Sequence, residues 1–63
     1  MKIGDIIKVR YPHDAYFAGE RHIGVVTATQ ETGSHFNMFW CFGTDSEHIV
    51  DPYRDEIEVI SES

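Results

Sequence analysis

Hydrophobic and polar residues alternate along several short stretches of the chain, which is the pattern of β-strands that bury one face. The clearest stretch spans residues 6–11, where Ile7, Val9 and Tyr11 share one face and a lysine and an arginine share the other. No stretch repeats apolar residues at a sustained helical spacing. We therefore expect an all-β fold with five strands, at residues 6–11, 21–29, 34–42, 47–50 and 55–60.

Turn-forming residues separate these strands. Pro12 cannot donate to a strand ladder and ends the first strand, and a longer loop follows over residues 12–20. Gly33 suits a left-handed position in the turn after the second strand. Asp51 can cap a helical turn and Pro52 is favoured at its start, so we expect a short 3-10 turn there, directly before the last strand.

The hairpin formed by the second and third strands has two open registers. In the first, His22 lies opposite Cys41. In the second, a one-residue bulge at Gly33 brings Trp40 over Gly24. A slip of one residue moves every side chain to the other face, yet in both registers an aromatic ring of the third strand is left on or near the outside.

Length and composition narrow the possible classes of protein. The chain has 63 residues, one cysteine and a formal net charge of −6. This length fits one domain, which we place at residues 1–60, with a frayed tail at residues 61–63. A cleft enzyme with a lid does not fit, because such a short chain buries only about 60% of its unfolded surface. One cysteine forms no internal disulfide and no run reaches the roughly 18 apolar residues of a membrane span, so we expect a cytoplasmic protein.

The order of elements resembles the SH3-like small barrels. The residues that carry the likeness include Gly4-Asp5 before the first strand, Gly24 in the second, and Pro52-Tyr53 before the last. The chain is most similar to short SH3-like proteins of phage and environmental genomes, and less similar to KOW-type modules. The resemblance implies a five-stranded barrel in which the first and last strands pair.

That pairing brings opposite charges together. Lys8 and Arg10 point away from the core on the first strand, and Glu56 and Glu58 do so on the last. Opposite charges that face each other across a strand pair contribute about 0.2–1 kcal/mol each. The inward residues of the last strand are then Ile57 and Val59.

Few residues of the sequence suggest a metal site or a catalytic site. The chain has four histidines, but neither Cys-x₂-Cys nor His-x₃-His spacing occurs, so we expect no metal site. His22 and Cys41 would place a base beside a thiol only if the hairpin register brings them together. We see no third orienting group and no phosphate-binding glycine loop, and we expect no enzyme, no catalytic residue and no cofactor.

Aromatic residues are the best functional lead. They exceed what one small barrel can bury, which predicts an exposed apolar patch of the kind that marks protein contacts. We expect a protein-binding or self-associating module with an acidic rim. Its predicted partner-binding residues are Tyr16, Phe17, Trp40 and Tyr53.

Two alternatives remain open at this stage. A nucleic-acid-binding module like the KOW type would use a basic patch together with stacking aromatics. That patch would consist of Lys2, Lys8, Arg10 and Arg21. An acidic phage factor that binds a basic host protein would instead use the acid-rich C-terminal half. The net negative charge disfavours the nucleic-acid alternative.

Overall fold

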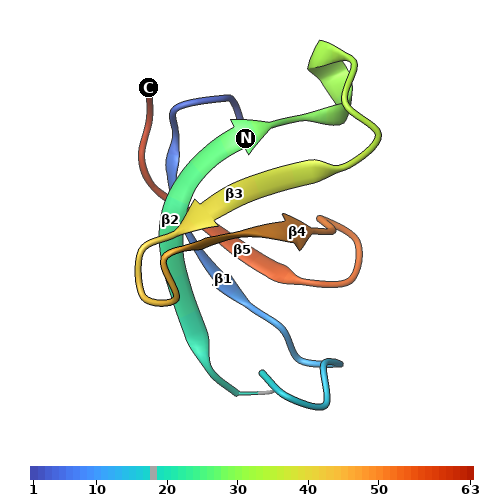
Figure 1. Ribbon diagram of the computed structural model, residues 1–63, viewed down its shortest axis with the longest axis vertical. Helices are drawn as coiled ribbons and strands as arrows, with labels where there is room; N and C mark the ends of the chain where they lie inside the picture. Colours follow the sequence, from blue (N-terminus) through green and yellow to red (C-terminus); the bar gives the residue numbers. More distant parts are fainter. Residues whose placement is uncertain (18) are drawn as a thin grey trace.

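The chain folds into one antiparallel sheet of five strands, as the computed structural model shows (Figure 1). The structure describes residues 1–17 and 19–63, so residue 18 of the predicted first loop lies outside it. The strands are β1 (Ile6–Arg10), β2 (Arg21–Ala28), β3 (Asn37–Cys41), β4 (Ser46–Val50) and β5 (Glu56–Ser61). The predicted all-β class and the five strands are confirmed.

The strands lie in the order β4-β3-β2-β1-β5, and β2 curves so that the sheet wraps around one side (Figure 1). β4 and β5 are the two edges of this order, and the sheet is not closed. The barrel expected from the sequence is therefore not confirmed.

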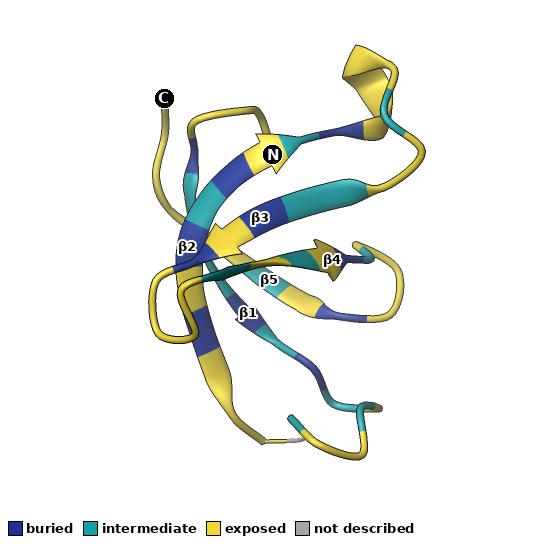
Figure 2. Ribbon diagram, in the orientation of Figure 1, coloured by how far each residue is buried: buried dark blue, intermediate teal, exposed yellow. Residues whose placement is uncertain are grey.

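The core lies on the concave face of the sheet. The predicted inward residues of the first strand, Ile7, Val9 and Tyr11, are all buried. The other strands add the remaining buried apolar side chains, which are Val26, Phe39, Cys41 and Val50. Figure 2 shows buried and exposed residues alternating along β2 and β3, as expected for strands with one face inside.

The predicted pairing of the first and last strands is confirmed, including its charges. Lys8 lies opposite Glu58 and Arg10 opposite Glu56 in the ladder between β1 and β5. The Arg10 Nη1 and Glu56 Oε2 atoms are 3.1 Å apart, and the Lys8 Nζ and Glu58 Oε2 atoms are 3.7 Å apart. The alternation of apolar and charged residues in β1 and that in β5 are therefore both consistent with the observed register of this strand pair.

The last strand differs from the prediction in depth of burial. Ile57 packs against the core, but Val59 is 40% exposed although it lies opposite Ile7 on the inner side. β5 is an edge strand of an open sheet, so its inner face is covered only in part. Ser61 belongs to β5, and the Ser63 N–H donates to Asp5 Oδ1 over 2.8 Å, which links the end of the chain to its start.

Neither predicted register of the β2–β3 hairpin is correct. Gly24 pairs with Cys41 and Val25 with Trp40, and the ladder shifts between Val26 and Ala28. This bulge near the end of β2 changes the pairing by one residue, and the sequence pattern carries no sign of it. The first predicted register still assigned each side chain to the correct face of the sheet. Near Val25 and Trp40 it differs from the observed register by an even number of residues, which leaves the faces unchanged.

The 3-10 element is in a different place from the one predicted. It spans Gln30–Thr32, between β2 and β3, and ends at Gly33, which has the expected left-handed conformation with φ 97°. The segment before β5 is a hydrogen-bonded turn in which the Asp55 N–H donates to the Asp51 carbonyl over 2.8 Å. Asp51 caps this turn as predicted, since its Oδ1 accepts from the Tyr53 N–H over 2.9 Å.

Two buried carboxylates tie down segments next to the sheet. The N–H groups of Ser63 and then Lys2 hold the pKa of Asp5 below its ordinary value. Burial opposes ionisation of Asp55, but hydrogen bonds from Arg54 and from the Asp51 N–H outweigh it and lower the pKa of that carboxyl. Both groups are therefore charged at neutral pH and hold their turns in place.

Candidate interaction surface

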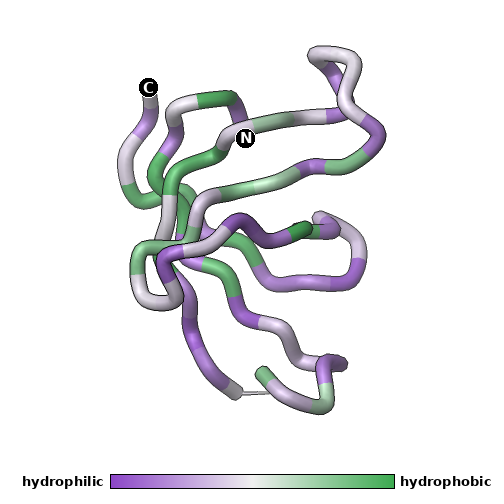
Figure 3. The backbone as a smooth tube through the Cα atoms, viewed as in Figure 1, coloured by the Kyte–Doolittle hydropathy of each residue, from purple (hydrophilic) through white to green (hydrophobic). Residues whose placement is uncertain are grey.

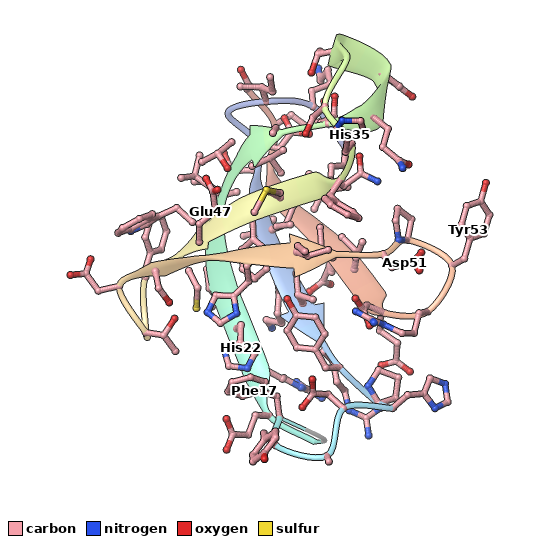
Figure 4. All side chains as sticks on the ribbon, turned by 45° about the vertical axis from the view of Figure 1, so that its right-hand side comes forward. Phe17, His22, His35, Glu47, Asp51 and Tyr53 are labelled. Atoms are coloured by element: carbon pink, nitrogen blue, oxygen red, sulfur yellow. The ribbon has the colours of Figure 1, made fainter. Side chains whose placement is uncertain are left out.

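The four predicted partner-binding residues do not form one patch. Tyr16 and Tyr53 are 87% and 100% exposed and lie on loops, whereas Trp40 is 38% exposed on the outer face of β3. Phe17 packs against the core on the opposite side of the sheet. Figure 4 shows Phe17 beside His22, with Tyr53 projecting away from them at another end of the molecule.

Phe17 covers a cluster of rings on the inner face. Its ring centroid lies 5.2 Å from that of His22 and 5.9 Å from that of His48, both in edge-to-face geometry. The two imidazoles stack at 6.0 Å, and Tyr11 contacts both Phe17 and His22. These contacts make Phe17 a packing residue of the first loop, so the structure separates it from the exposed aromatics.

His22 and Cys41 do meet, although they are not opposite each other in the ladder. The Cys41 sulfur lies 3.6 Å from His22 Nδ1, and the Glu20 carboxylate lies 3.9 Å from His22 Nε2. Cys41 is fully buried, so its thiol has no contact with solvent from which a substrate could approach. Within residues 1–17 and 19–63, no three His, Cys, Asp or Glu side chains are grouped so as to hold a metal ion.

Tyr11 connects this cluster to β4. Its hydroxyl donates to the Ile49 carbonyl over 3.0 Å, and burial raises its pKa. The phenol therefore stays neutral at physiological pH and acts as a fixed hydrogen-bond donor that holds the β4 edge over the core.

The outer face of β2, β3 and β4 carries a continuous apolar surface, which we call the outer patch. The outer patch consists of Ile23, Val25, Met38, Trp40, Phe42 and Ile49. Cross-strand pairing joins its members: Val25 lies opposite Trp40, and Met38 lies opposite Ile49. Ile23 accepts a backbone hydrogen bond from Phe42, which extends the row beyond β3.

Most of the outer patch is open to solvent. Phe42 is 53% exposed, Ile49 45%, Ile23 41% and Trp40 38%, whereas Val25 and Met38 are intermediate. Figure 3 shows the change along β2, from hydrophilic residues at its start to hydrophobic ones further along. A single exposed apolar side chain is normal on a protein surface, but contiguous apolar side chains of this size mark contact sites.

Charges border the outer patch on two sides. On β1, β2 and β5 the outward charged side chains are Lys8, Arg10, Arg21, Glu56 and Glu58. On β4, Glu47 reaches over β3 and accepts a hydrogen bond from the Thr27 hydroxyl over 2.8 Å (Figure 4). The outer face thus carries three basic and three acidic side chains, and the chain's formal charge of −6 resides elsewhere.

This arrangement gives little support to a phosphate-binding patch. Two of the four predicted basic residues, Lys8 and Arg10, are paired with carboxylates of β5. Lys2 lies outside the sheet, in the turn that its backbone N–H closes on Asp5. The four predicted basic residues therefore lie in two separate parts of the molecule, and carboxylates neutralise two of them.

A second aromatic region surrounds the turn before β5. Two neighbouring hollows of about 470 and 540 Å³ are both lined by Gln30, Asn37, Pro52 and Tyr53. Phe36, which is 53% exposed, lines the larger one, whereas Trp40 lines neither. The ring that shares a surface with Tyr53 is therefore Phe36, which the sequence analysis did not select.

The sequence analysis also missed most of the outer patch. Of its six residues only Trp40 was predicted as partner-binding, because the selection relied on aromatic type and on the resemblance. The available signal was that both faces of this hairpin are partly apolar: Ile23, Val25 and Trp40 point outward, whereas Val26 and Phe39 point inward.

Comparisons with protein-family models, with curated proteins and with solved structures give no significant match to this chain. None of the helical segments in residues 1–17 and 19–63 is long and apolar enough to cross a membrane. The chemistry of the surface therefore carries the functional argument.

Proposed function

We propose that this chain is a non-enzymatic protein-interaction module whose contact surface is the outer patch. The observation that carries the proposal is the run of adjoining, solvent-open apolar side chains across three neighbouring strands. Burial of such surface contributes about 25 cal/mol per Å² and is the main driving force of protein association.

The surroundings of the patch fit a binding surface. Interfaces combine an apolar, aromatic centre with a polar rim. Here Trp40 lies at the centre, between Val25 and Glu47, while charged side chains occupy the border strands. Tryptophan is among the residues that most often contribute the largest share of binding energy.

For the fold, we propose a relationship to the SH3-like proteins. The pairing of β1 with β5 and the sheet order with β1 between β2 and β5 support it. The open sheet edge and the 3-10 element between β2 and β3 are departures from that plan. The proposed contact surface does not depend on this relationship.

A peptide-library selection tests the proposed function. The wild-type chain is immobilised and challenged with a phage-displayed library of random dodecapeptides, and selected clones are then measured against variants. We expect the clones to bind wild type, to lose at least tenfold in affinity for Trp40→Ser, and to bind the Tyr16→Ser control as well as wild type. Clones that bind Trp40→Ser unchanged, or a selection without enriched clones from a chain that also stays monomeric at 2 mM, would contradict the proposal.

A further inference from the structure

We infer that the partner of the outer patch is a second copy of this chain, packed face to face about a two-fold axis. The inference rests on the proposed function and names the occupant of the same surface. Two antiparallel sheets pack through their apolar faces at a separation of about 10 Å. The outer patch is such a face, since four of its six side chains are exposed. Glu47 crosses it at β3, where it accepts a hydrogen bond from the Thr27 hydroxyl.

The charge distribution favours a second copy over a partner of opposite charge. Two chains of formal charge −6 repel each other over most of their surfaces. The outer face is the exception, because its three basic and three acidic side chains balance. A strongly basic partner, by contrast, would be drawn to the acidic remainder of the molecule and not to this face.

The borders of the patch are also complementary to each other. Arg21 lies at the β2 border next to Arg10, and among the described residues it forms no ion pair. Glu47 lies at the β4 border on the other side of Trp40. A two-fold axis in the contact plane can bring Arg21 of one copy toward Glu47 of the other while the apolar centres meet.

The size of the contact surface determines how tightly the two copies are expected to bind. A standard interface buries about 800 Å² per partner, which is about one fifth of the 4199 Å² accessible surface of this chain. The outer patch has six residues and six charged residues border it, which is fewer than the roughly 20–30 residues that a standard interface uses on each side. This places the contact in the weak class. We expect a dissociation constant of about 10 µM to 1 mM, that is, about 4–7 kcal/mol.

Sedimentation equilibrium of the full chain between 10 µM and 2 mM tests the inference. We expect wild type to pass from monomer to dimer and Phe42→Ser or Ile49→Ser to weaken the dimer at least tenfold. The matched control is Tyr16→Ser, which removes an exposed ring of the first loop, away from the outer patch, and should change the constant less than twofold. Circular dichroism at 10 µM verifies that every variant is folded.

A second measurement keeps the result independent of any single variant. Because dimerisation stabilises the folded state by mass action, the melting temperature of wild type should rise with concentration, and that of Phe42→Ser should not. A wild-type chain that stays monomeric at 2 mM, or equal weakening by Phe42→Ser and Tyr16→Ser, overturns the inference. If selected library peptides still require Trp40 in that case, the proposed function survives and only the second copy is wrong.

Discussion

Replacing Gly24 by alanine should be among the most damaging small changes to this fold. Gly24 lies in the middle of β2, opposite Cys41 of β3. A Cβ atom at this position would come within 1.9 Å of the Trp40 carbonyl oxygen and 2.7 Å of Phe39 Cδ2. One methyl group therefore meets both the backbone of the neighbouring strand and the largest buried ring.

The magnitude follows from what would have to move. The Trp40 carbonyl belongs to the β2–β3 ladder, so it cannot turn aside as the end of a side chain can. Overpacking costs typically about 1–3 kcal/mol and occasionally more, and a backbone clash lies at the upper end of that range. A chain of this length has a total stability of about 3–9 kcal/mol. We expect Gly24→Ala to remove at least about 3 kcal/mol and to lower the melting temperature by about 12–24 °C.

The chain offers a matched control for this experiment. Gly43→Ala makes the same chemical change where no atom lies within 4 Å of the new Cβ and where φ is not positive. It should leave stability within about 1 kcal/mol of wild type, because alanine also restricts the unfolded chain. The assay is urea unfolding followed by circular dichroism at a single low protein concentration. Equal unfolding midpoints for the two variants would show that the close approach of β2 and β3 at Gly24 is not as described.

Three further changes test other contacts. Asp5→Asn should lower the urea midpoint at pH 7, and the difference from wild type should shrink as the pH falls below about 4. The N–H of Ser63 lowers the pKa of Asp5, so the carboxylate's contribution to stability is complete above the unfolded-state pKa and is lost as the pH falls through the folded-state pKa. A difference between the two proteins that does not depend on pH would contradict this. A double-mutant cycle on Lys8 and Glu58 should give a coupling of about 0.2–1 kcal/mol that decreases in 0.5 M NaCl, and zero coupling at low salt would rule out the ion pair. Phe17→Ala should cost about 1–3 kcal/mol because its ring packs on the buried histidine cluster; an unchanged melting curve would place this ring outside the core.

The first and last strands could be predicted because their outward faces are mostly charged. Ile7 and Val9 alternate with charged residues, so burial of one face determines which side chains point out. The opposite charges of Lys8 and Glu58 then agree with a single register. The depth of burial could not be predicted, since Val59 points to the inner side but is uncovered where the sheet stays open.

The β2–β3 hairpin could not be predicted because both of its faces are apolar. A register is strongly specified when one face must be buried and the other must be polar. Val25 and Val26 are adjacent in sequence and face opposite sides, yet either could have filled the core. The bulge between Val26 and Ala28 then changed the pairing in a way that depends on the packing of the whole sheet. The aromatic content alone also did not distinguish Phe17, which packs inward, from Trp40.

Antiparallel sheets usually place apolar side chains inside and polar ones outside on every strand. Here Lys8 and Arg10 of β1 and Glu56 and Glu58 of β5 follow this rule. β2, β3 and β4 depart from it, together with Ile6, which lies opposite Val25, and Ile60, which is 50% exposed. If the surplus of apolar residues only reflected a core too small to hold them, they would be scattered over both halves of the outer face. They instead gather in one part of the outer face, and its border crosses β2 between Arg21 and Ile23 and β1 between Ile6 and Lys8. A surface with such a defined boundary has the organisation of an interface, and the balanced charges along its edges are what two copies of an otherwise acidic chain require in order to meet there.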